Sequence, residues 1–401
     1  MKRIAIVGGG PIGLEAALAA IERGYAAEVF ERGLVADAVR QWGHVRMFSP
    51  FSMNATARGR VRLKHSGIEL PKPDELLTGA QFRERYLAPL ARSFPAGAIH
   101  ENCAVLAIGR SRVLKGDHIG AISRGETAFR LLVCEDDRER AVTADVVLDC
   151  SGTYGQPNQL GDGGIPLPNE RLYLEQIHYG IPEFSGAMRA RYDGKRVLVV
   201  GAGHSAATVI CNLAALDPAT KIHWLMRRDR ELPSEEIPDD PLPERARLAA
   251  AANRFARDHR VILHRAASIA ALESHQAALR VEIVGSTGSA TVEVDEIIVA
   301  TGFRPDLSLT RELQVQTCWA TEGTYPLAAS LLGEASADCL KTPAFGAEML
   351  IHPEPGYFTL GMKSYGRSPN FLLRTGHEQI ETVFDWMDKQ SLGESAKAEA
   401  A

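Results

Sequence analysis

Residues 2–17, KRIAIVGGGPIGLEAA, decide the fold of this chain. An apolar run rich in β-branched residues stops at Gly8, and an Ala- and Leu-rich helical pattern starts at about Pro11. The glycines between them have the spacing G-x-G-x-x-G. Gly8 permits a tight turn, Gly10 lets the backbone approach a diphosphate, and Gly13 lets the helix lie close to the strand. The stretch therefore predicts a dinucleotide site at the N-terminus of a helix.

An acidic residue follows where such a site needs one. The second hydrophobic run, residues 26–31, ends in Glu31, 18 residues after Gly13. A carboxylate there accepts hydrogen bonds from the hydroxyls of an adenosine ribose. Arg32 follows directly and is assigned to the same cofactor site. The alternative interpretation is a glycine turn in an ordinary α/β protein.

The opening motif recurs 193 residues later. Residues 195–208, KRVLVVGAGHSAAT, again predict a strand, a glycine turn and a helix. Two such turns imply two dinucleotides, or one dinucleotide and one degenerate site. The residues assigned to the second cofactor site are Gly201, Gly203, His204, Ser205 and Ala206, with Ala206 in the third small position.

The strand after the second turn ends in Arg227 and Arg228, where the first copy has Glu31. A carboxylate favours a free ribose 2′-hydroxyl, whereas a guanidinium favours a 2′-phosphate. The first site is therefore predicted to bind FAD and the second to bind NADPH. Asp229 leaves NADH as an alternative, and a solvated strand end is the alternative interpretation of the two arginines.

Two further strand ends carry a small polar residue and a glycine, Ser151-Gly152 and Thr301-Gly302. Glycine at these positions permits backbone contact with a flat or charged group. The segment 41–54 mixes aromatic, Met, Arg and His side chains without helical or strand periodicity. We expect this segment to border a ligand, with Gln41 and Trp42 nearest to it; a buried structural loop is the alternative.

The composition excludes several classes of protein. With 401 residues, two domains are the natural expectation. The 45 basic and 50 acidic residues give a net charge of −5, so no strong basic field is available for nucleic acid or an anionic membrane. None of the six cysteines lies in a C-x-x-C pair, which argues against a zinc ribbon and a dithiol redox centre.

The remaining bulk features predict a soluble protein without a metal site. The acidic residues in 231–243 lie among prolines and are expected to form a solvated loop. The N-terminus has no signal-peptide pattern, and no run approaches the roughly 18 apolar residues of a membrane span. We therefore expect a cytoplasmic location.

Taken in order, the two glycine motifs, Glu31, Asp149-Cys-Ser-Gly152, Arg227-Arg228 and Ala300-Thr-Gly-x-x-Pro305 resemble the two-dinucleotide-binding-domain flavoproteins. Within them, the chain is most similar to FAD- and NADPH-dependent monooxygenases of the flavin-containing, N-hydroxylating and Baeyer–Villiger type. The resemblance implies an α/β fold with two Rossmann-like dinucleotide-binding domains. The NADPH domain, residues 194–298, is inserted in an FAD domain of residues 1–160 and 299–390. Composition adds a Pro- and Gly-rich linker over 161–193 and a flexible tail over 391–401.

The chain departs from this family pattern at two places. The signature F-x-G-x-x-x-H would end at His178, but Leu172 and Leu174 stand at the matching positions. The Gly-Asp pair expected near the flavin ribityl chain is Gly361-Met362 here, so the segment 370–376 is expected to hold that end of FAD instead. The predicted cofactor contacts in this part of the chain are Gly361, Met362, Phe371 and Leu372.

The resemblance implies NADPH-dependent flavin chemistry. Hydride passes from the nicotinamide to FAD, and the reduced flavin reacts with molecular oxygen to give a hydroperoxide, which inserts one oxygen atom into a small organic substrate. Asn54 is the expected catalytic polar group near the reactive flavin position. The alternatives are an NADPH-dependent flavin reductase or dehydrogenase without oxygen insertion, and a non-catalytic redox-sensing protein that binds dinucleotides. The sequence carries no signal for the oligomeric state.

Overall fold

The computed structural model describes residues 1–286, 288–333 and 346–399. The chain forms two compact units. Unit 1 comprises residues 1–156 and 304–401, and unit 2 comprises residues 157–303, so unit 2 is inserted in unit 1. Each unit contains a five-stranded parallel sheet with helices. The predicted fold class, α/β with two Rossmann-like domains of which one is inserted in the other, is confirmed.

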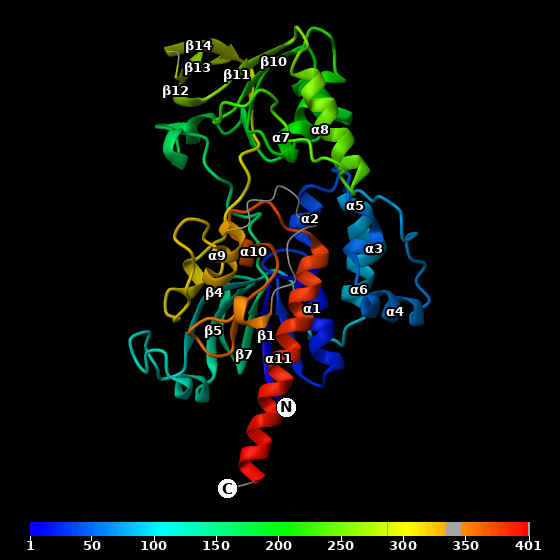
Figure 1. Ribbon diagram of the computed structural model, residues 1–401, viewed down its shortest axis with the longest axis vertical. Helices are drawn as coiled ribbons and strands as arrows, with labels where there is room; N and C mark the ends of the chain where they lie inside the picture. Colours follow the sequence, from blue (N-terminus) through cyan, green and yellow to red (C-terminus); the bar gives the residue numbers. More distant parts are fainter. Residues whose placement is uncertain (287, 334–345, 400–401) are drawn as a thin grey trace. The chain divides into compact units, whose positions relative to one another are not determined.

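Unit 1 is built on a parallel sheet in the order β16-β7-β1-β2-β3, of which Figure 1 labels β1 and β7. Its strands are β1 (Arg3–Val7), β2 (Ala26–Phe30), β3 (Ile99–His100), β7 (Val146–Asp149) and β16 (Tyr357–Thr359). An antiparallel sheet consists of β4 (Cys103–Arg110), β5 (Phe129–Glu135) and β6 (Arg138–Ala144). Asp149 is in register with Val7 and with Thr359. The segments that follow β1, β7 and β16 therefore leave the sheet at one edge.

The helices of unit 1 are α1 (Pro11–Glu22), α2 (Asp37–Gln41), α3 (Phe51–Asn54), α4 (Ala57–His65), α5 (Gly79–Phe82), α6 (Ala88–Arg92), α9 (Tyr325–Gly333), α10 (Met362–Tyr365) and α11 (Leu373–Glu399). Short 3₁₀ turns span Ile122–Glu126, Ser308–Thr310 and Ala347–Met349. A π turn at Arg83–Leu87 separates α5 from α6, directly before Pro89, which has no N–H for an α-helical bond. α11 continues to Glu399, where the sequence predicted a flexible tail from residue 391.

Both faces of the parallel sheet in unit 1 are buried. Ile4 and Ile6 of β1 pack in one cluster with α1 and α11, whereas Ala5 and Val7 pack against the antiparallel sheet. Successive side chains of a strand point to opposite faces, so alternate residues of β1 serve different layers. α1 and α11 lie side by side (Figure 1).

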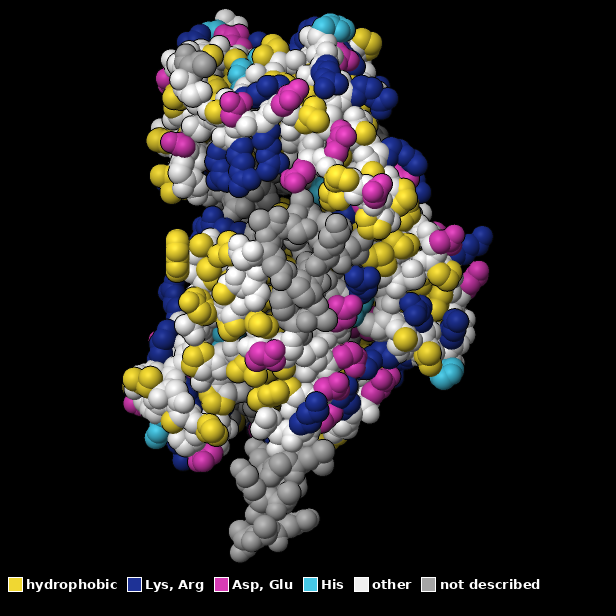
Figure 2. Space-filling model, viewed as in Figure 1, with side chains coloured by type: hydrophobic (Ala, Val, Ile, Leu, Met, Phe, Trp, Pro, Cys, Tyr) yellow, Lys and Arg dark blue, Asp and Glu magenta, His cyan; other side chains and the backbone are white. Residues whose placement is uncertain are grey.

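The surface of the α1–α11 pair carries a charge network. Arg23 follows α1 and pairs with Glu381, Asp385 and Asp388 of α11 at 3.0, 2.8 and 2.6 Å. Figure 2 shows acidic and basic side chains together over α11. Within the described residues, no helix has the length and apolar character that crossing a membrane requires.

Unit 2 repeats the arrangement with a parallel sheet in the order β11-β10-β9-β15-β8. Its elements are β8 (Ile177–Tyr179), β9 (Arg196–Val200), α7 (His204–Ala214), β10 (Lys221–Leu225), α8 (Pro243–Phe255), β11 (Val261–His264), β12 (Ala267–His275), β13 (Ala278–Gly285), β14 (Gly288–Val294) and β15 (Glu296–Val299). Its 3₁₀ turns span Asp162–Gly164, Glu170–Tyr173 and Gly186–Arg191. β12, β13 and β14 form an antiparallel sheet.

The strands of unit 2 also alternate between two layers. Val197 and Val199 of β9 pack with α7 and α8, whereas Leu198 and Val200 pack with the antiparallel sheet. Residues 161–193, expected as a linker, lie within unit 2, where β8 adds an edge strand beside β15.

Candidate dinucleotide-binding sites

The turn between β1 and α1 is closely packed at two glycines and open at the third. Gly8 has φ +100°, and a Cβ there would lie 2.7 Å from the carbonyl oxygen of Cys150. A Cβ on Gly13 would lie 1.9 Å from the carbonyl oxygen of Gly8. At Gly10, by contrast, a Cβ would meet no heavy atom within 4 Å. Gly10 is the N-cap of α1 and no side chain caps this helix, so its first amides border open space, the arrangement that binds a diphosphate.

Glu31 follows β2 and supports this turn. The residue is 9% exposed, and its Oε2 and Oε1 accept the backbone N–H groups of Gly9 (2.7 Å) and Gly33 (3.0 Å). An ionised carboxylate has about four acceptor positions, so two remain for ribose hydroxyls. The exposed Arg32 extends over Gly155, where a Cβ would lie 2.3 Å from its Nη2.

Ser151 and Gly152 follow β7 and lie against the same turn. A Cβ on Gly8 would lie 2.9 Å from the Cα of Ser151. The Ser151 hydroxyl donates to Asp149 Oδ1 (2.6 Å) and accepts from Lys363 Nζ (3.0 Å), and its backbone N–H donates to Asp149 Oδ1 (3.1 Å). Gly152 has φ +66° and no heavy atom within 4 Å of a Cβ position. The Ser151 hydroxyl is thus hydrogen-bonded within the protein, and Gly152 is the residue of this pair that borders open space.

A buried ion pair, Asp149 with Lys363, holds this segment. The side chains are 0% and 2% exposed, and Lys363 Nζ donates to Asp149 Oδ2 at 2.6 Å. The Tyr357 hydroxyl donates to the same oxygen at 2.6 Å. Burial opposes ionisation of Asp149, but the charge of Lys363 and the hydrogen bonds outweigh it and hold the pKa of this carboxyl below its ordinary value. Sequence reasoning missed Lys363 and Tyr357, because neither belongs to a spaced motif.

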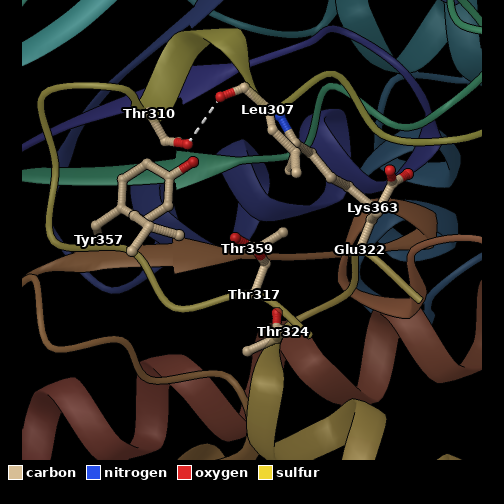
Figure 3. A pocket seen from close by; sticks show the side chains of 9 residues that line it. Leu307, Thr310, Thr317, Glu322, Thr324, Tyr357, Thr359 and Lys363 are labelled. Carbon is tan, nitrogen blue, oxygen red and sulfur yellow. Dashed lines mark hydrogen bonds between the residues drawn. The ribbon is translucent and has the colours of Figure 1, made fainter. Parts of the chain in front are cut away.

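A cavity of about 10 Å³ borders Lys363 (Figure 3). That volume is what about one buried water needs. Thr317, Thr324 and Thr359 lie close together in Figure 3, and the hydroxyl of Thr324 is buried without a hydrogen-bond partner in the described part of the chain. The other lining residues are Leu307, Thr310, Val315, Glu322, Tyr357 and Lys363. The cavity is far smaller than the roughly 300 Å³ or more of a ligand pocket, so it does not hold an organic substrate.

The segment around Gly361 packs on the first turn of α1. Gly361 has φ +70°, and a Cβ there would lie 3.0 Å from Ile12 Cγ1; a Cβ on Gly376 would lie 2.4 Å from Ile12 Cδ1. The Gly361 N–H donates to Oε1 of Gln379 in α11 at 2.8 Å. Met362, the first residue of α10, is half-buried and offers a thioether where the family pattern has a carboxylate. The structure therefore brings Gly361 to the first cofactor site without a carboxylate beside it.

Four other predicted flavin contacts are engaged within the protein. Gln41 donates to Oδ2 of Asp37 at 2.9 Å, one turn away in the same helix. Trp42 packs against Gly79, where a Cβ would lie 2.6 Å from its Cε3. Leu372 is buried at 7% exposure. Phe371 is half-buried and makes an edge-on contact with Tyr365, their ring centroids 5.4 Å apart.

Asn54, predicted as the catalytic group, has a structural role. It is 3% exposed. Its amide nitrogen donates to the carbonyl oxygens of Ser49 (3.0 Å) and Pro50 (3.1 Å), and its Oδ1 accepts the Ser49 hydroxyl at 2.9 Å. Both donors and the acceptor oxygen therefore close the loop that precedes α3. The catalytic role of Asn54 stays a prediction; the hydrogen bonds of the side chain leave one acceptor position of Oδ1 for another group.

The turn between β9 and α7 repeats the first turn in unit 2. Gly201 has φ +128°, and a Cβ there would lie 2.3 Å from the carbonyl oxygen of Ala300. Gly203 is the N-cap of α7, and a Cβ there would meet no heavy atom within 4 Å. The indole N–H of Trp224 donates to the carbonyl oxygen of Gly201 at 2.7 Å. Ala206, in the third position, is fully buried. This turn also fits a diphosphate against a helix N-terminus.

Four further residues that the sequence predicts to bind a cofactor divide into two groups. His204 and Ser205 form the first turn of α7, beside the open position. The Thr301 hydroxyl donates to the carbonyl oxygen of Asn158 at 2.8 Å, and the carbonyl oxygen of Gly302 accepts the Asn158 N–H at 2.9 Å. Thr301 and Gly302 therefore fasten two chain segments of unit 2 to each other.

Arg227 and Arg228 follow β10 at the carboxyl edge of the parallel sheet in unit 2. Both are exposed, and neither guanidinium pairs with a carboxylate of the described residues. The nearby Arg230 differs, since it pairs with Glu235 at 3.5 Å. Two uncommitted guanidiniums at this edge are able to bind a 2′-phosphate.

A family model described as pyridine nucleotide-disulphide oxidoreductase matches residues 5–329, a range that includes both glycine turns. The chain belongs to this family. Members of the pyridine nucleotide-disulphide oxidoreductase family are flavoproteins that use FAD and a pyridine nucleotide, which accords with one glycine turn in each unit.

Solved structures share the fold over nearly the whole chain. Bacillithiol disulfide reductase Bdr (YpdA) from Bacillus cereus is 16% identical with a TM-score of 0.71, over 97% of this chain and 99% of that one. Thioredoxin reductase from T. acidophilum is 13% identical with a TM-score of 0.62, over 96% and 99%. The ornithine N-hydroxylase from Kutzneria sp. 744 is 16% identical with a TM-score of 0.62, over 98% and 100%. At these identities the likeness is one of fold. A search of curated proteins found no match.

Disulfide chemistry, named in the family description, needs a pair of thiols. The cysteines of the described residues form no disulfide: Cys103, Cys134, Cys150, Cys211 and Cys318. Cys150 is adjacent to the first glycine turn, and burial together with the charge of Asp149 raises the pKa of its thiol. A raised pKa lowers the thiolate population and disfavours a nucleophilic role. The described part of the chain also holds no group of three metal-ligating side chains.

Proposed function

We propose that this protein binds FAD in unit 1 and NADPH in unit 2, and that it uses the reduced flavin and molecular oxygen to insert one oxygen atom into a small organic substrate. One comparison carries the cofactor assignment. The two glycine turns share an open middle glycine, Gly10 or Gly203, but the strand that follows ends in Glu31 in one unit and in Arg227 and Arg228 in the other. Carboxylates suit a free ribose, and guanidiniums suit a phosphorylated one.

Each residue then has a defined task. The amides that follow Gly10 bind the FAD diphosphate, and Glu31 accepts hydrogen bonds from the ribose. The amides that follow Gly203 bind the NADPH diphosphate, and Arg227 and Arg228 bind the 2′-phosphate. FAD, when bound, supplies the redox chemistry, which transfers hydride equivalents to oxygen. The protein orients the two cofactors and limits access of water.

The cysteines support an electron acceptor other than a protein dithiol, and molecular oxygen is the acceptor we propose. The sequence has no C-x-x-C pair, and the thiol beside the first turn, Cys150, is held protonated by burial. Electrons from the reduced flavin thus lack a protein dithiol in the described residues. The balanced reaction consumes one NADPH, one proton, one O₂ and one substrate, and it yields NADP⁺, water and the oxygenated product.

A second function, NADPH-dependent reduction of an organic acceptor without oxygen insertion, is favoured by the position of Asn54. The amide of Asn54 is committed to Ser49 and Pro50, so its N–H groups are not free for the oxygen step to which the sequence had assigned this side chain.

Two stages of one experiment test both functions. Purified protein is first mixed with NADPH without oxygen, and we expect the visible flavin absorbance to bleach; an unbleached spectrum contradicts the cofactor assignment. Oxygen is then admitted together with small amines or ketones. Oxygen insertion predicts equal consumption of NADPH and O₂ with little hydrogen peroxide. If the reduced flavin is reoxidised slowly in air and faster after a quinone is added, the protein is a reductase instead.

A further inference from the structure

We propose that Lys363 is a positioning residue for the FAD site, which acts through Asp149 and Ser151 without touching the cofactor. The proposal rests on the FAD assignment of unit 1 made above. It concerns a buried ion pair for which the glycine motifs provide no role.

The topology of the sheet places the pair beside the cofactor turn. Asp149 ends β7 in register with Val7, the last residue of β1, and with Thr359, the last residue of β16. The segments after these strands carry Gly8, Ser151 and Lys363 respectively. The Asp149–Lys363 contact therefore ties the segment after β16 to the segment after β7. Gly8 in turn contacts that segment so closely that a Cβ would lie 2.9 Å from Ser151 Cα.

The two oxygens of Asp149 have separate tasks. Oδ1 accepts both the hydroxyl and the backbone N–H of Ser151. Oδ2 accepts Lys363 Nζ and the Tyr357 hydroxyl, both at 2.6 Å. Lys363 and Tyr357 thus fix the plane of the carboxylate, and the carboxylate fixes Ser151. Gly152, the next residue, borders open space in the left-handed conformation, so its direction depends on how Ser151 is held.

Stability alone does not account for such a pair. Replacing both partners of a buried ion pair with uncharged groups is often neutral or stabilising, because the cost of removing two charges from water disappears with them. Two of the three N–H groups of Lys363 donate to Asp149 and Ser151, so these two cannot donate to the cofactor. Lys363 also lines the small cavity of about 10 Å³. The ammonium is thus held by Asp149 and Ser151, and we infer that it acts on the site through Ser151.

The test separates positioning from stability with the double variant Asp149→Asn/Lys363→Met. Thermal unfolding is followed after FAD removal, and FAD affinity is measured by the recovery of flavin fluorescence on dilution of the holoprotein. We expect an unfolding midpoint close to that of the wild type, but a Kd for FAD at least about tenfold higher, because a small misplacement of binding groups has large effects. The single variant Lys363→Met leaves a buried unpaired carboxylate and is expected to unfold at a lower temperature.

The matched control is Asp240→Asn/Arg245→Met, which removes a buried ion pair in unit 2 whose side chains are both 2% exposed. Its FAD affinity should stay within about twofold of the wild type, since this pair belongs to unit 2 and the FAD turn belongs to unit 1. Ser151→Ala is the second variant, which removes the hydroxyl that joins Lys363 to Asp149 and leaves both charges in place; its Kd should also rise.

The proposal is overturned if the Asp149/Lys363 double variant, or Ser151→Ala should the double variant not fold, binds FAD within about twofold of the wild type. A loss equal to that of the control overturns it as well. None of these measurements uses NADPH or oxygen, so a wild-type protein that binds FAD but fails to oxidise NADPH contradicts the proposed function alone.

Discussion

The two glycine turns of this protein have the same backbone design and differ in what surrounds it. The first glycine is blocked in both, by Cys150 at Gly8 and by Ala300 at Gly201. The third position differs: a Cβ on Gly13 would strike the Gly8 carbonyl oxygen at 1.9 Å, whereas unit 2 accommodates a methyl group at Ala206. The first position of the motif must be glycine in both units, because the residue that follows a neighbouring strand leaves no room for a Cβ. The third position depends on how closely the helix approaches its turn, so unit 1 needs glycine there and unit 2 does not.

The residues that would select the cofactor differ in the same way. Glu31 is buried and bonded to two backbone amides of its own turn, so it is positioned before any cofactor binds. Arg227 and Arg228 are exposed and uncommitted. A preorganised site loses little entropy on binding, whereas exposed arginines must be ordered by the ligand. We therefore expect unit 1 to retain its cofactor and unit 2 to exchange its own.

The largest expected effect is that of Gly13→Ala. The new Cβ would lie 1.9 Å from a backbone oxygen, so α1 must shift away from its turn. We expect a loss of about 2 kcal/mol or more of stability and purification without bound flavin. The ratio of flavin to protein absorbance and the unfolding midpoint measure this. The control Ala206→Gly removes a methyl group in the other turn and should cost only about 1 kcal/mol with flavin retained. Equal behaviour of the two variants would show that the turns do not differ.

Removing both arginines in Arg227→Ala/Arg228→Ala is expected to act next in size. Charge-assisted hydrogen bonds contribute about 1.5–3 kcal/mol each, so the KM for NADPH should rise roughly tenfold or more while the KM for NADH stays unchanged. Steady-state kinetics with both nucleotides measure the change. Arg230→Ala, whose side chain already pairs with Glu235, is the control and should leave both constants near the wild-type values. An unchanged KM for NADPH in the double variant contradicts the phosphate role.

A smaller effect is expected from Glu31→Gln. The amide NH₂ cannot accept the N–H of Gly9 or Gly33, so one of the two bonds is lost and the turn loosens. One hydrogen bond to an ionised group corresponds to about 1.5–3 kcal/mol, and because only one bond is lost, the Kd for FAD should rise about tenfold. Flavin fluorescence on dilution measures it. Glu28→Gln, an exposed position of the same strand, should bind FAD as the wild type does; an identical loss there would deny Glu31 a specific role.

The smallest expected effect concerns acid stability in unit 2. Burial, with further contributions from the charges of His264 and Arg196, lowers the pKa of His223 to about 4. The unfolded chain, with an ordinary histidine pKa of about 6.5, therefore binds the proton more readily than the folded protein, and stability falls as the pH drops from about 6.5 towards 4.

Replacing His223 by Phe should reduce this fall in the unfolding midpoint between pH 7 and pH 5. His259→Phe is the control, because that side chain is 85% exposed, and it should leave the pH profile as in the wild type. If the unfolding midpoint falls equally steeply with pH in the His223 and His259 variants, His223 is not the cause of the fall.

Local patterns made much of this structure predictable. Glycine spacing is a requirement of a few consecutive backbone units, so both turns and the parallel α/β sheets around them follow from short stretches of sequence. The alternation of layers along β1 and β9 was not visible, because a strand buried on both faces reads as a continuous apolar run.

Contacts between residues that are far apart in the sequence could not be predicted from such patterns. Lys363 and Asp149 are 214 residues apart, and nothing local marks Lys363 as the partner of the carboxylate that closes the first site. Asn54 shows the opposite case, because its partners, Ser49 and Pro50, are close in sequence. The sequence pattern does not separate such local contacts, which close a loop, from contacts with a ligand.

The bonds of Asn158 with Thr301 and Gly302 have a consequence for engineering. They hold the two ends of unit 2 together, with the Asn158 N–H 2.9 Å from the Gly302 carbonyl oxygen. In unit 1 the Arg304 N–H likewise donates to the carbonyl oxygen of Gln156 at 2.8 Å. In each unit, the two chain segments that lead to the other unit are joined by a hydrogen bond. Chain ends that lie this close together are typical of sites where a segment can be inserted or removed. We therefore expect that residues 157–303 can be exchanged for the equivalent segment of a relative, and that a short peptide can close the gap left in unit 1.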